Sequence, residues 1–266
     1  MKIIHSYKEF YKNNGLMKTL LKIISKPLRL INKKIAYRNF IKSREKIFDH
    51  KSIKDRFSYI YSAHYWPSKE SVSGPGSELK NTKNIREEIK KIIEQYKIKK
   101  FLDIPCGDFT WIQSVINNDI DYIGGDIVTE LITKNVKKNN SSNVNFINID
   151  LLEDKLPNAD LMLCRDCLVH LSNKNVKKFL QNFINSDIKY ILITSYESSL
   201  SNKALNTNIE IDDGDFRPTY LRESPFNFPK PAIKILDKDI EHSKNPNFKC
   251  YLYLYSKSQL KHLIEN

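Results

Sequence analysis

Short apolar runs alternate with amphipathic segments through the middle of the chain. The apolar runs have the length and composition of buried strands and lie at residues 101–104, 121–127, 143–149, 160–164 and 190–194. Helices are expected between or before them, at residues 82–96, 110–115, 129–138 and 176–184. In the first of these helices Thr82 or Asn84 is the expected N-cap. Strands that alternate with helices at this spacing predict βαβ units and a parallel sheet, an α/β fold of the Rossmann-like type.

The regular pattern stops after Tyr196 and returns only near the end of the chain. Residues 250–255 alternate as a strand, and residues 257–264 form a short amphipathic segment that predicts a last helix. The stretch between them, residues 198–247, is rich in Asn, Asp and Pro. Long irregular segments inside compact domains are usually functional or disordered. Its aromatic residues and prolines favour an ordered substrate lid, so residues 198–247 are predicted to be an insertion over the site.

Charge separates the first fifty residues from the rest. Residues 1–50 hold 13 Lys and Arg against 3 Asp and Glu, whereas residues 51–266 hold 31 against 28. The expected domains are a basic helical arm at residues 1–55 and an α/β domain at residues 56–266. Three interpretations of the arm stay open: its apolar stripe packs on the domain or on a partner chain, it lies on an anionic membrane, or, least favoured, it contacts nucleic acid. The nearly neutral body argues against a nucleic-acid partner, because nucleic-acid binders carry a basic recognition face.

No apolar run of this sequence approaches the length of a membrane span, and the N-terminus lacks the pattern of a secretory signal. The protein is therefore expected in the cytoplasm, with the inner face of the membrane as a second place for the arm. Four scattered cysteines do not make a disulfide framework. Cys164 and Cys167 have C-x-x-C spacing but no second ligand pair, so no metal is expected.

Five carboxylates fall at or just after the ends of the predicted strands: Asp103, Asp108, Asp126, Asp150 and Asp166. The carboxyl ends of parallel strands meet at one edge of a sheet, where ligands bind. Acids gathered there repel a diphosphate but attract a sulfonium or an ammonium.

Two of these acids have a specific predicted role. Asp126 lies 19 residues after Gly107, near the spacing of roughly 20 expected for an acid that accepts from ribose hydroxyls. Asp150 is expected to accept from an adenine amino group. The alternative for every one of these acids is a structural cap of a turn or helix.

Four motifs, in order, resemble the class I S-adenosylmethionine-dependent methyltransferases, and among them a bacterial group linked to surface polysaccharides and capsules. The motifs are Ser73-Gly74-Pro75-Gly76-Ser77 with Thr82 and Arg86, Leu102-Asp103-Ile104-Pro105-Cys106-Gly107-Asp108, Cys164-Arg165-Asp166-Cys167-Leu168-Val169-His170-Leu171, and Asp213-Gly214-Asp215-Phe216-Arg217-Pro218 with Pro225-Phe226. The resemblance covers roughly residues 65–255. It implies a seven-stranded sheet with one antiparallel strand and S-adenosylmethionine as cofactor.

The resemblance and the strand ends together suggest a set of cofactor-binding residues. They are Ser73, Gly74, Arg86, Asp103, Pro105, Cys106, Gly107, Asp126, Ile127, Asp150, Leu151 and Arg165. Among them, Arg86 is expected to hold the cofactor carboxylate, with Ser73 and Gly74 closing over it. The Pro105-Cys106-Gly107-Asp108 turn replaces the more common glycine-rich loop of these enzymes.

The expected reaction is methyl transfer to an oxygen of a sugar or phosphoramidate group in a surface-glycan precursor. His170 is the first candidate for the general base and Asp166 the second, with a purely structural histidine as the alternative. Arg165 and Arg217 are expected to bind an anionic acceptor, and Asp215 and Tyr196 to contact it. Two other functions stay open: a methyltransferase acting on nucleic acid or another small molecule, and a non-catalytic cofactor-binding module of a glycan-synthesis complex.

Overall fold

The structure is a computed structural model that describes residues 41–139, 141–198, 208–238 and 248–264, together with residues 31, 35, 38 and 39. The chain divides into two compact units, Met1–Asp49 and His50–Asn266. In the first unit residues 41–48 form a helix. Most of the predicted basic arm, including its apolar stripe at residues 16–31, lies outside the described residues except for Ile31.

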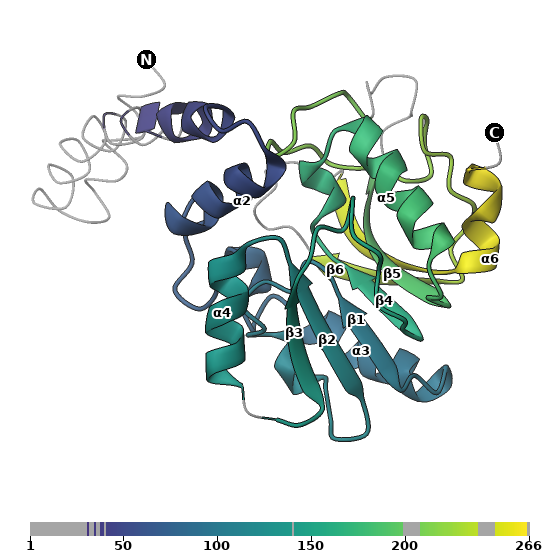
Figure 1. The fold of residues 1–266 in the computed structure, drawn as a ribbon. Helices are drawn as coiled ribbons and strands as arrows, with labels where there is room; N and C mark the ends of the chain where they lie inside the picture. Colours follow the sequence, from purple (N-terminus) through teal and green to yellow (C-terminus); the bar gives the residue numbers. More distant parts are fainter. Residues whose placement is uncertain are drawn as a thin grey trace, which may run out of the picture. The chain divides into compact units, whose positions relative to one another are not determined.

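A seven-stranded sheet forms the centre of the second unit (Figure 1). Its strands are β1 (Lys100–Asp103), β2 (Asp121–Asp126), β3 (Val144–Asn148), β4 (Leu161–Cys164), β5 (Tyr190–Ser198), β6 (Ile233–Lys238) and β7 (Phe248–Ser256). Their order is β3-β2-β1-β4-β5-β7-β6. The first five strands pair in parallel, and β7 runs antiparallel to both β5 and β6. The expected mostly parallel sheet with one antiparallel strand at residues 250–255 is confirmed.

Helices cover both faces of this sheet. They are α2 (Ile53–Ser62), α3 (Lys83–Gln95), α4 (Thr129–Lys138), α5 (Asn173–Asn185) and α6 (Lys257–Leu260), with short 3-10 turns η1 (Pro75–Ser77), η2 (Ile112–Ser114), η3 (Leu168–His170) and η5 (Lys261–Leu263). Phe101 of β1 packs in the apolar cluster that contains α3, whereas its neighbour Leu102 packs in the cluster that contains α5. Successive strand residues point to opposite faces, so α3 and α5 cover opposite faces of the sheet (Figure 1).

The prediction that residues 198–247 form an irregular segment is wrong in one part. Residues 233–238 form β6, which pairs with β7 at the edge of the sheet. In β6 the side chains of Ile235 and Asp237 are buried, those of Ile233 and Leu236 are half-buried, and Lys234 is exposed. Such a short edge strand after a Pro-rich stretch has a weak sequence signal, and its pairing with β7 decides its conformation.

Thr82 occupies the N-cap position of α3, as expected, but does not cap the helix with its side chain. Its hydroxyl donates to the carbonyl oxygens of Glu78 and Leu79 instead, at 3.1 and 3.3 Å. The predicted helix at residues 110–115 is only the single turn η2.

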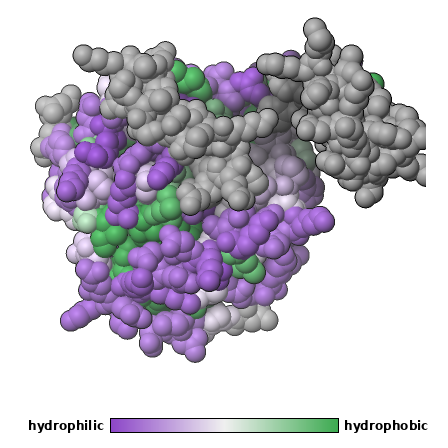
Figure 2. Space-filling view, turned by 180° about the vertical axis from the view of Figure 1, so that it is seen from behind, coloured by the Kyte–Doolittle hydropathy of each residue, from purple (hydrophilic) through white to green (hydrophobic). Residues whose placement is uncertain are grey.

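Among the described residues, no helix has both the length and the apolar content required to cross a membrane. The side seen in Figure 2 is mainly hydrophilic, with its hydrophobic residues gathered in a limited area near the middle.

Two adjacent glycines in β2 allow close packing around the sheet. A Cβ atom on Gly125 would lie 2.6 Å from Ile149 Cγ2 and 2.8 Å from Ile104 Cγ1. Both isoleucines belong to buried parts of the core, directly after β3 and β1. A side chain at position 125 would therefore push apart the two segments that carry the strand ends.

We expect Gly125→Ala to lower the free energy of unfolding by about 1 to 3 kcal/mol, because the added methyl group overpacks this part of the core. Urea denaturation measures the change. Asn145→Ala is the matched control, since Asn145 is exposed on β3 and its substitution should shift stability by less than about 0.5 kcal/mol. Equal unfolding midpoints for wild type and Gly125→Ala would contradict this prediction.

Candidate functional site

Two buried carboxylates stand at the ends of neighbouring strands, Asp103 on β1 and Asp126 on β2. The strand order changes direction between β1 and β4, so Asp103 stands at the switch point of the sheet and Asp126 stands one strand away from it. The Tyr122 hydroxyl donates to Asp103 Oδ2 at 2.8 Å. Burial raises the pKa of Asp103 to about 7, although this hydrogen bond lowers it.

Asp126 organises the turn that follows β1. Its Oδ2 accepts from the Gly107 N–H at 3.3 Å and its Oδ1 from the Val128 N–H at 3.0 Å. Burial raises the pKa of Asp126 to about 6, against these two N–H groups, which lower it. The turn is also held by a 2.8 Å bond from the Cys106 N–H to the Gly125 carbonyl and a 2.7 Å bond from the Asn135 amide to the Gly107 carbonyl. The N–H of the glycine thus points to a carboxylate, whereas a diphosphate-binding loop directs such groups to its ligand.

Asp108 fastens a second loop onto this turn. Its carboxylate accepts from the Ser71 hydroxyl at 3.1 Å, from the Val72 N–H at 2.8 Å and from the Thr110 N–H at 3.2 Å. Gly107 has a φ of +55°, and a Cβ there would lie 2.2 Å from Ser73 Oγ. Ser73 therefore lies directly against the turn, which brings the first and second sequence motifs together.

Asp150 follows β3, and its observed contacts are those of a turn cap. Its Oδ1 accepts from the Leu152 N–H at 2.8 Å, and its own N–H donates to Asp154 Oδ2 at 2.8 Å. Both Ile127 and Leu151 are half-buried. The predicted contacts of Asp150, Ile127 and Leu151 with a cofactor stay predictions, and one Asp150 oxygen already serves the local turn.

Arg165, directly after β4, is a buried residue whose guanidinium is bonded within the protein. Its Nε and Nη2 donate to the two oxygens of Asp237 on β6, each at 2.9 Å, and Nη2 also donates to the Gly76 carbonyl at 2.9 Å. The guanidinium lies 5.2 Å from the ring centre of Trp111. These contacts connect β4 to the edge of the sheet and to the Ser73–Ser77 motif. The role of Arg165 in binding a cofactor or an acceptor stays a prediction.

Asp166 has a φ of +52°, in the left-handed region that Asp tolerates better than most residues. Its N–H donates to the Thr194 hydroxyl at 2.8 Å, and its carboxylate lies 3.6 Å from Arg165 Nη1. Asp166, Asp237 and Cys250 offer ligand atoms within 4.8 Å of one another. The guanidinium of Arg165 lies beside both acids and offsets one of their two negative charges.

His170 ends the 3-10 turn after β4 and is held on both sides of its ring. Its Nδ1 lies 2.7 Å from the carbonyl oxygen of Asp215. The ring stacks on Trp66 with 5.0 Å between centroids and lies 5.7 Å from the ring of Phe216. Trp66 in turn contacts the loop over the β1 turn, because a Cβ on Gly74 would lie 2.9 Å from Trp66 Cβ. The structure therefore connects His170 with Gly74, which the sequence had only placed in separate motifs.

Among the remaining predicted acceptor-binding residues, Arg217 and Tyr196 are buried and Asp215 is half-buried. Arg217 is only 2% exposed, and its guanidinium donates to the Ile209 and Leu168 carbonyls, the Thr219 hydroxyl and the Asn173 side chain. Tyr196 is buried, and burial raises the pKa of its hydroxyl. These contacts of Arg217 are structural, and the roles of Arg217, Asp215 and Tyr196 toward an acceptor stay predictions.

Arg86, on α3, donates to the Ser114 hydroxyl at 3.1 Å and to the Leu79 carbonyl at 2.9 Å. Its Nε is buried and has no hydrogen-bond partner within the described part of the chain. A buried donor without an acceptor is costly, so this atom fits an oxygen ligand such as a carboxylate. The predicted contact of Arg86 with the cofactor carboxylate stays a prediction.

Sequence reasoning missed four residues that shape the site: Trp66, Tyr122, Asn135 and Asp237. Only Asn135 had a usable signal, because it occupies the apolar stripe of α4 beside Leu131 and Ile132. Asp237 sits in the edge strand that the sequence did not reveal. Its partner Arg165 lies 72 residues away, so no local pattern connects them.

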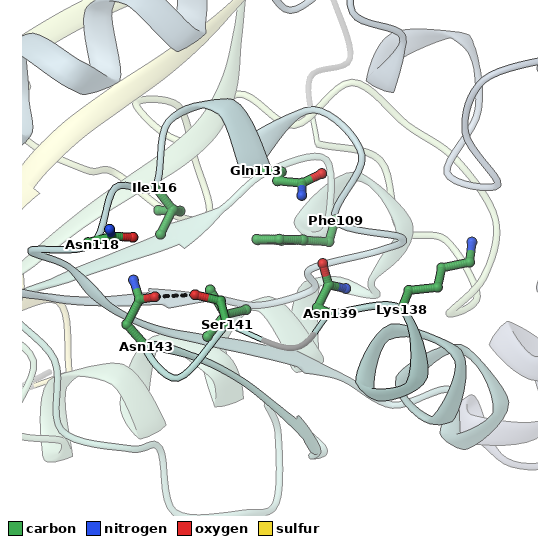
Figure 3. Close-up of a pocket in the computed structure, with 9 residues that line it drawn as sticks. Phe109, Gln113, Ile116, Asn118, Lys138, Asn139, Ser141 and Asn143 are labelled. Carbon is green, nitrogen blue, oxygen red and sulfur yellow. Dashed lines mark hydrogen bonds between the residues drawn. The ribbon is translucent and has the colours of Figure 1, made fainter.

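A pocket of about 400 Å³ lies beside Phe109, two residues after Gly107 (Figure 3). It is lined by the connection from β1 to β2, the end of α4 and the start of β3, through Phe109, Gln113, Ile116, Asn118, Lys138, Asn139, Ser141, Asn143 and Val144. None of the predicted cofactor or acceptor residues lines it. The Asn143 side chain is bonded to Ser141 and to the backbone of Asn117 and Ile120, so part of its polar wall is structural.

No protein-family model and no curated protein matches the sequence. Similar solved structures include the PH0226 protein from Pyrococcus horikoshii OT3, at 15% identity and a TM-score of 0.47, covering 68% of this chain and 93% of that one. Magnesium protoporphyrin IX methyltransferase from Synechocystis PCC 6803, solved with bound SAH, has 8% identity and a TM-score of 0.46 over 73% and 93% of the two chains. The N-terminal domain of EvdMO1, solved in the presence of SAH and D-fucose, has 10% identity and a TM-score of 0.46 over 65% and 82%. Identity this low does not assign an activity or a ligand.

We expect Asp108→Ala to loosen residues 71–77, because it removes the acceptor of the Ser71 hydroxyl and the Val72 N–H. The Val72 amide should exchange with solvent at least about tenfold faster, as expected when a segment loses its closing hydrogen bonds. Hydrogen exchange followed by NMR measures this rate. Asp119→Ala is the control, since Asp119 is exposed on a different loop. Unchanged protection of Val72 in Asp108→Ala would show that the loop is held by other contacts.

Proposed function

We propose that the chain is an S-adenosylmethionine-dependent methyltransferase that methylates an oxygen of a small glycan precursor. The choice of cofactor rests on one observation: Asp103 and Asp126 stand buried at the ends of β1 and β2, and the Gly107 N–H is bonded to Asp126. A diphosphate would meet two carboxylates and no outward glycine N–H in this turn. A nucleoside with a sulfonium and an ammonium meets complementary charge.

The residues around the turn fit such a nucleoside. Each oxygen of Asp126 accepts one backbone N–H, and a carboxylate oxygen has a second lone pair for a ribose hydroxyl. Arg86 Nε is a donor for a carboxylate. When bound, S-adenosylmethionine supplies an activated methyl group that is transferred in line to a nucleophile. The protein's task is then to align the acceptor, exclude water and remove a proton.

His170 is suited to take the acceptor proton. Its Nδ1 contacts a carbonyl oxygen, which can only accept, so Nδ1 carries the hydrogen. In the neutral ring the basic lone pair is therefore on Nε2. Asp166 stays the second candidate, since its half-exposed carboxylate lies four residues before His170.

The acceptor class rests on the motif resemblance, which links the chain to enzymes of surface polysaccharides. The sugar or phosphoramidate oxygen, the cytoplasmic location and the contact of residues 1–50 with a membrane or partner protein belong to this part of the proposal. A nucleic-acid acceptor is disfavoured by the nearly equal numbers of basic and acidic residues in residues 51–266.

We expect the affinity for S-adenosylmethionine to fall as the pH is lowered through about 6. The Asp126 carboxyl, whose pKa is raised to about 6, becomes protonated there and is then a weaker acceptor for the ribose hydroxyls. Asp126→Asn should weaken binding at pH 8 by about 1 to 3 kcal/mol and flatten the decline at low pH. Calorimetric titration measures both.

The control for this experiment is Asp121→Asn, at the exposed opposite end of the same strand, which should keep the wild-type affinity and pH profile. Wild-type binding by Asp126→Asn at pH 8 would remove this residue from the cofactor site.

We expect His170→Ala to lower turnover by about 100-fold or more while cofactor affinity is kept, because the variant lacks the base. Transfer of label from methyl-labelled S-adenosylmethionine into nucleotide-sugar and glycan-precursor pools measures turnover. His262→Ala is the control, because His262 is an exposed histidine of the C-terminal turn. Full-rate transfer by His170→Ala would eliminate the proposed base. Cofactor binding without label in any acceptor would favour a non-catalytic module.

A further inference from the structure

Phe216 is an exposed aromatic side chain beside the proposed base. It is 54% exposed, and its ring centroid lies 5.7 Å from that of His170, with the ring planes tilted by 55°. Single exposed apolar residues are common on protein surfaces and need no function. The surroundings of Phe216 distinguish it from such residues.

The backbone on both sides of Phe216 is fastened to the segment that carries His170. The Gly214 N–H donates to the His170 carbonyl at 2.8 Å, and His170 Nδ1 donates to the Asp215 carbonyl at 2.7 Å. The Arg217 N–H donates to the Val169 carbonyl at 2.9 Å. An exposed phenyl ring is thus held on a fixed backbone next to the base.

Arg217 strengthens this anchoring from inside the protein. Its guanidinium uses four of its five donors on the oxygens of Ile209, Leu168, Thr219 and Asn173. Such a buried, bonded group cannot turn toward an acceptor without leaving those oxygens unpaired. Arg217 is therefore a positioning residue for Phe216.

Two further arginines of the described residues near this segment, Arg165 and Arg56, are also bonded to the protein. Arg165 pairs with Asp237 and Gly76, and Arg56 donates to the carbonyl oxygens of His50 and Asp213. An acceptor recognised by its negative charge would need a cationic side chain with donors directed at it. The contacts of these three arginines point instead to an acceptor recognised by shape and apolar surface.

The rings also do not form a box for a quaternary ammonium group. Trp66 lies 5.0 Å from His170 with the ring planes tilted by 33°, and Phe57 lies 6.4 Å from His170 in an edge-on arrangement, so the rings pack on His170 and not around an empty centre. An ammonium-binding cage needs several ring faces directed at one point. Only Phe216 among these rings is more than half exposed.

We infer that Phe216 contacts the methyl acceptor and receives the apolar face of an uncharged sugar ring, with a ring hydroxyl directed to His170. The inference rests on the proposed function and adds that acceptor choice depends on this aromatic contact and not on charge. A pyranose has a face of C–H groups that loses water against a phenyl ring, while its hydroxyls stay at the edge. Phe216 and its anchor Arg217 are thereby specificity residues of the site.

The test is sugar binding by the full chain saturated with S-adenosylhomocysteine. Saturation-transfer NMR with the methyl glycosides of glucose, galactose and N-acetylglucosamine should detect at least one, with transfer strongest at its C–H face. Phe216→Ala should weaken that binding by about three- to tenfold, and Phe216→Tyr should restore it. Ile209→Ala is the matched control, because Ile209 is 49% exposed on the same segment and should bind as wild type.

Calorimetry with S-adenosylhomocysteine alone separates this inference from the proposed function. A chain that binds no S-adenosylhomocysteine or S-adenosylmethionine refutes both. A chain that binds them but binds no glycoside, or binds it equally in Phe216→Ala, refutes only the role of Phe216. Saturable binding of inorganic phosphate or choline in place of the glycosides would likewise overturn it, since these probes report recognition by charge.

Discussion

The carboxylate of Asp126 is the group on which the arrangement of the site depends. It accepts N–H groups from the turn after β1 and from the start of the segment that leads into α4. It thereby joins the turn after β1 to the end of β2. The same turn presents Gly107, with its left-handed backbone, to Ser73, and its carbonyl to Asn135 of α4. One buried acid thus holds in register the elements that would surround a cofactor.

Burying the charged form of such an acid is energetically unfavourable, and burial therefore raises the pKa of Asp126 toward neutrality. Asp103 is in the same condition at the end of β1. Groups with strongly shifted pKa values gather at functional sites, and on this ground we propose that the two acids lie close to a cationic cofactor. The charge of Arg165 is not available to these two acids in the same way, because the Arg165 guanidinium forms an ion pair with Asp237 on the edge strand. Arg165 is thus paired within the fold, whereas the acids at the ends of β1 and β2 are the groups that we propose for the cofactor.

The segment from Gly214 to Arg217 joins the proposed base to the proposed acceptor contact. The His170 ring donates to the Asp215 carbonyl, and the His170 carbonyl accepts from the Gly214 N–H. The buried guanidinium of Arg217 holds the same segment through the Leu168 carbonyl. The tautomer of His170 and the position of Phe216 consequently follow from the same set of hydrogen bonds. A substitution that releases this segment would disturb proton removal and acceptor alignment together, even without touching the cofactor.

The sequence alone determined the strands, the parallel sheet and the acids at the strand ends, because strand and helix periodicity is a local property that each segment carries by itself. It also predicted one antiparallel strand, through the motifs it shares with a known family. It did not reveal β6, whose conformation comes from pairing with β7, or the true partners of Arg165, Asp108 and Arg217. Arg165 and its partner Asp237 are 72 residues apart in the sequence. Asp108 and Val72 are 36 residues apart, and Arg217 and Leu168 are 49 residues apart. Only the tertiary structure decides such contacts, because a charged side chain binds whichever complementary group the fold brings within hydrogen-bonding distance, and sequence spacing does not encode that distance.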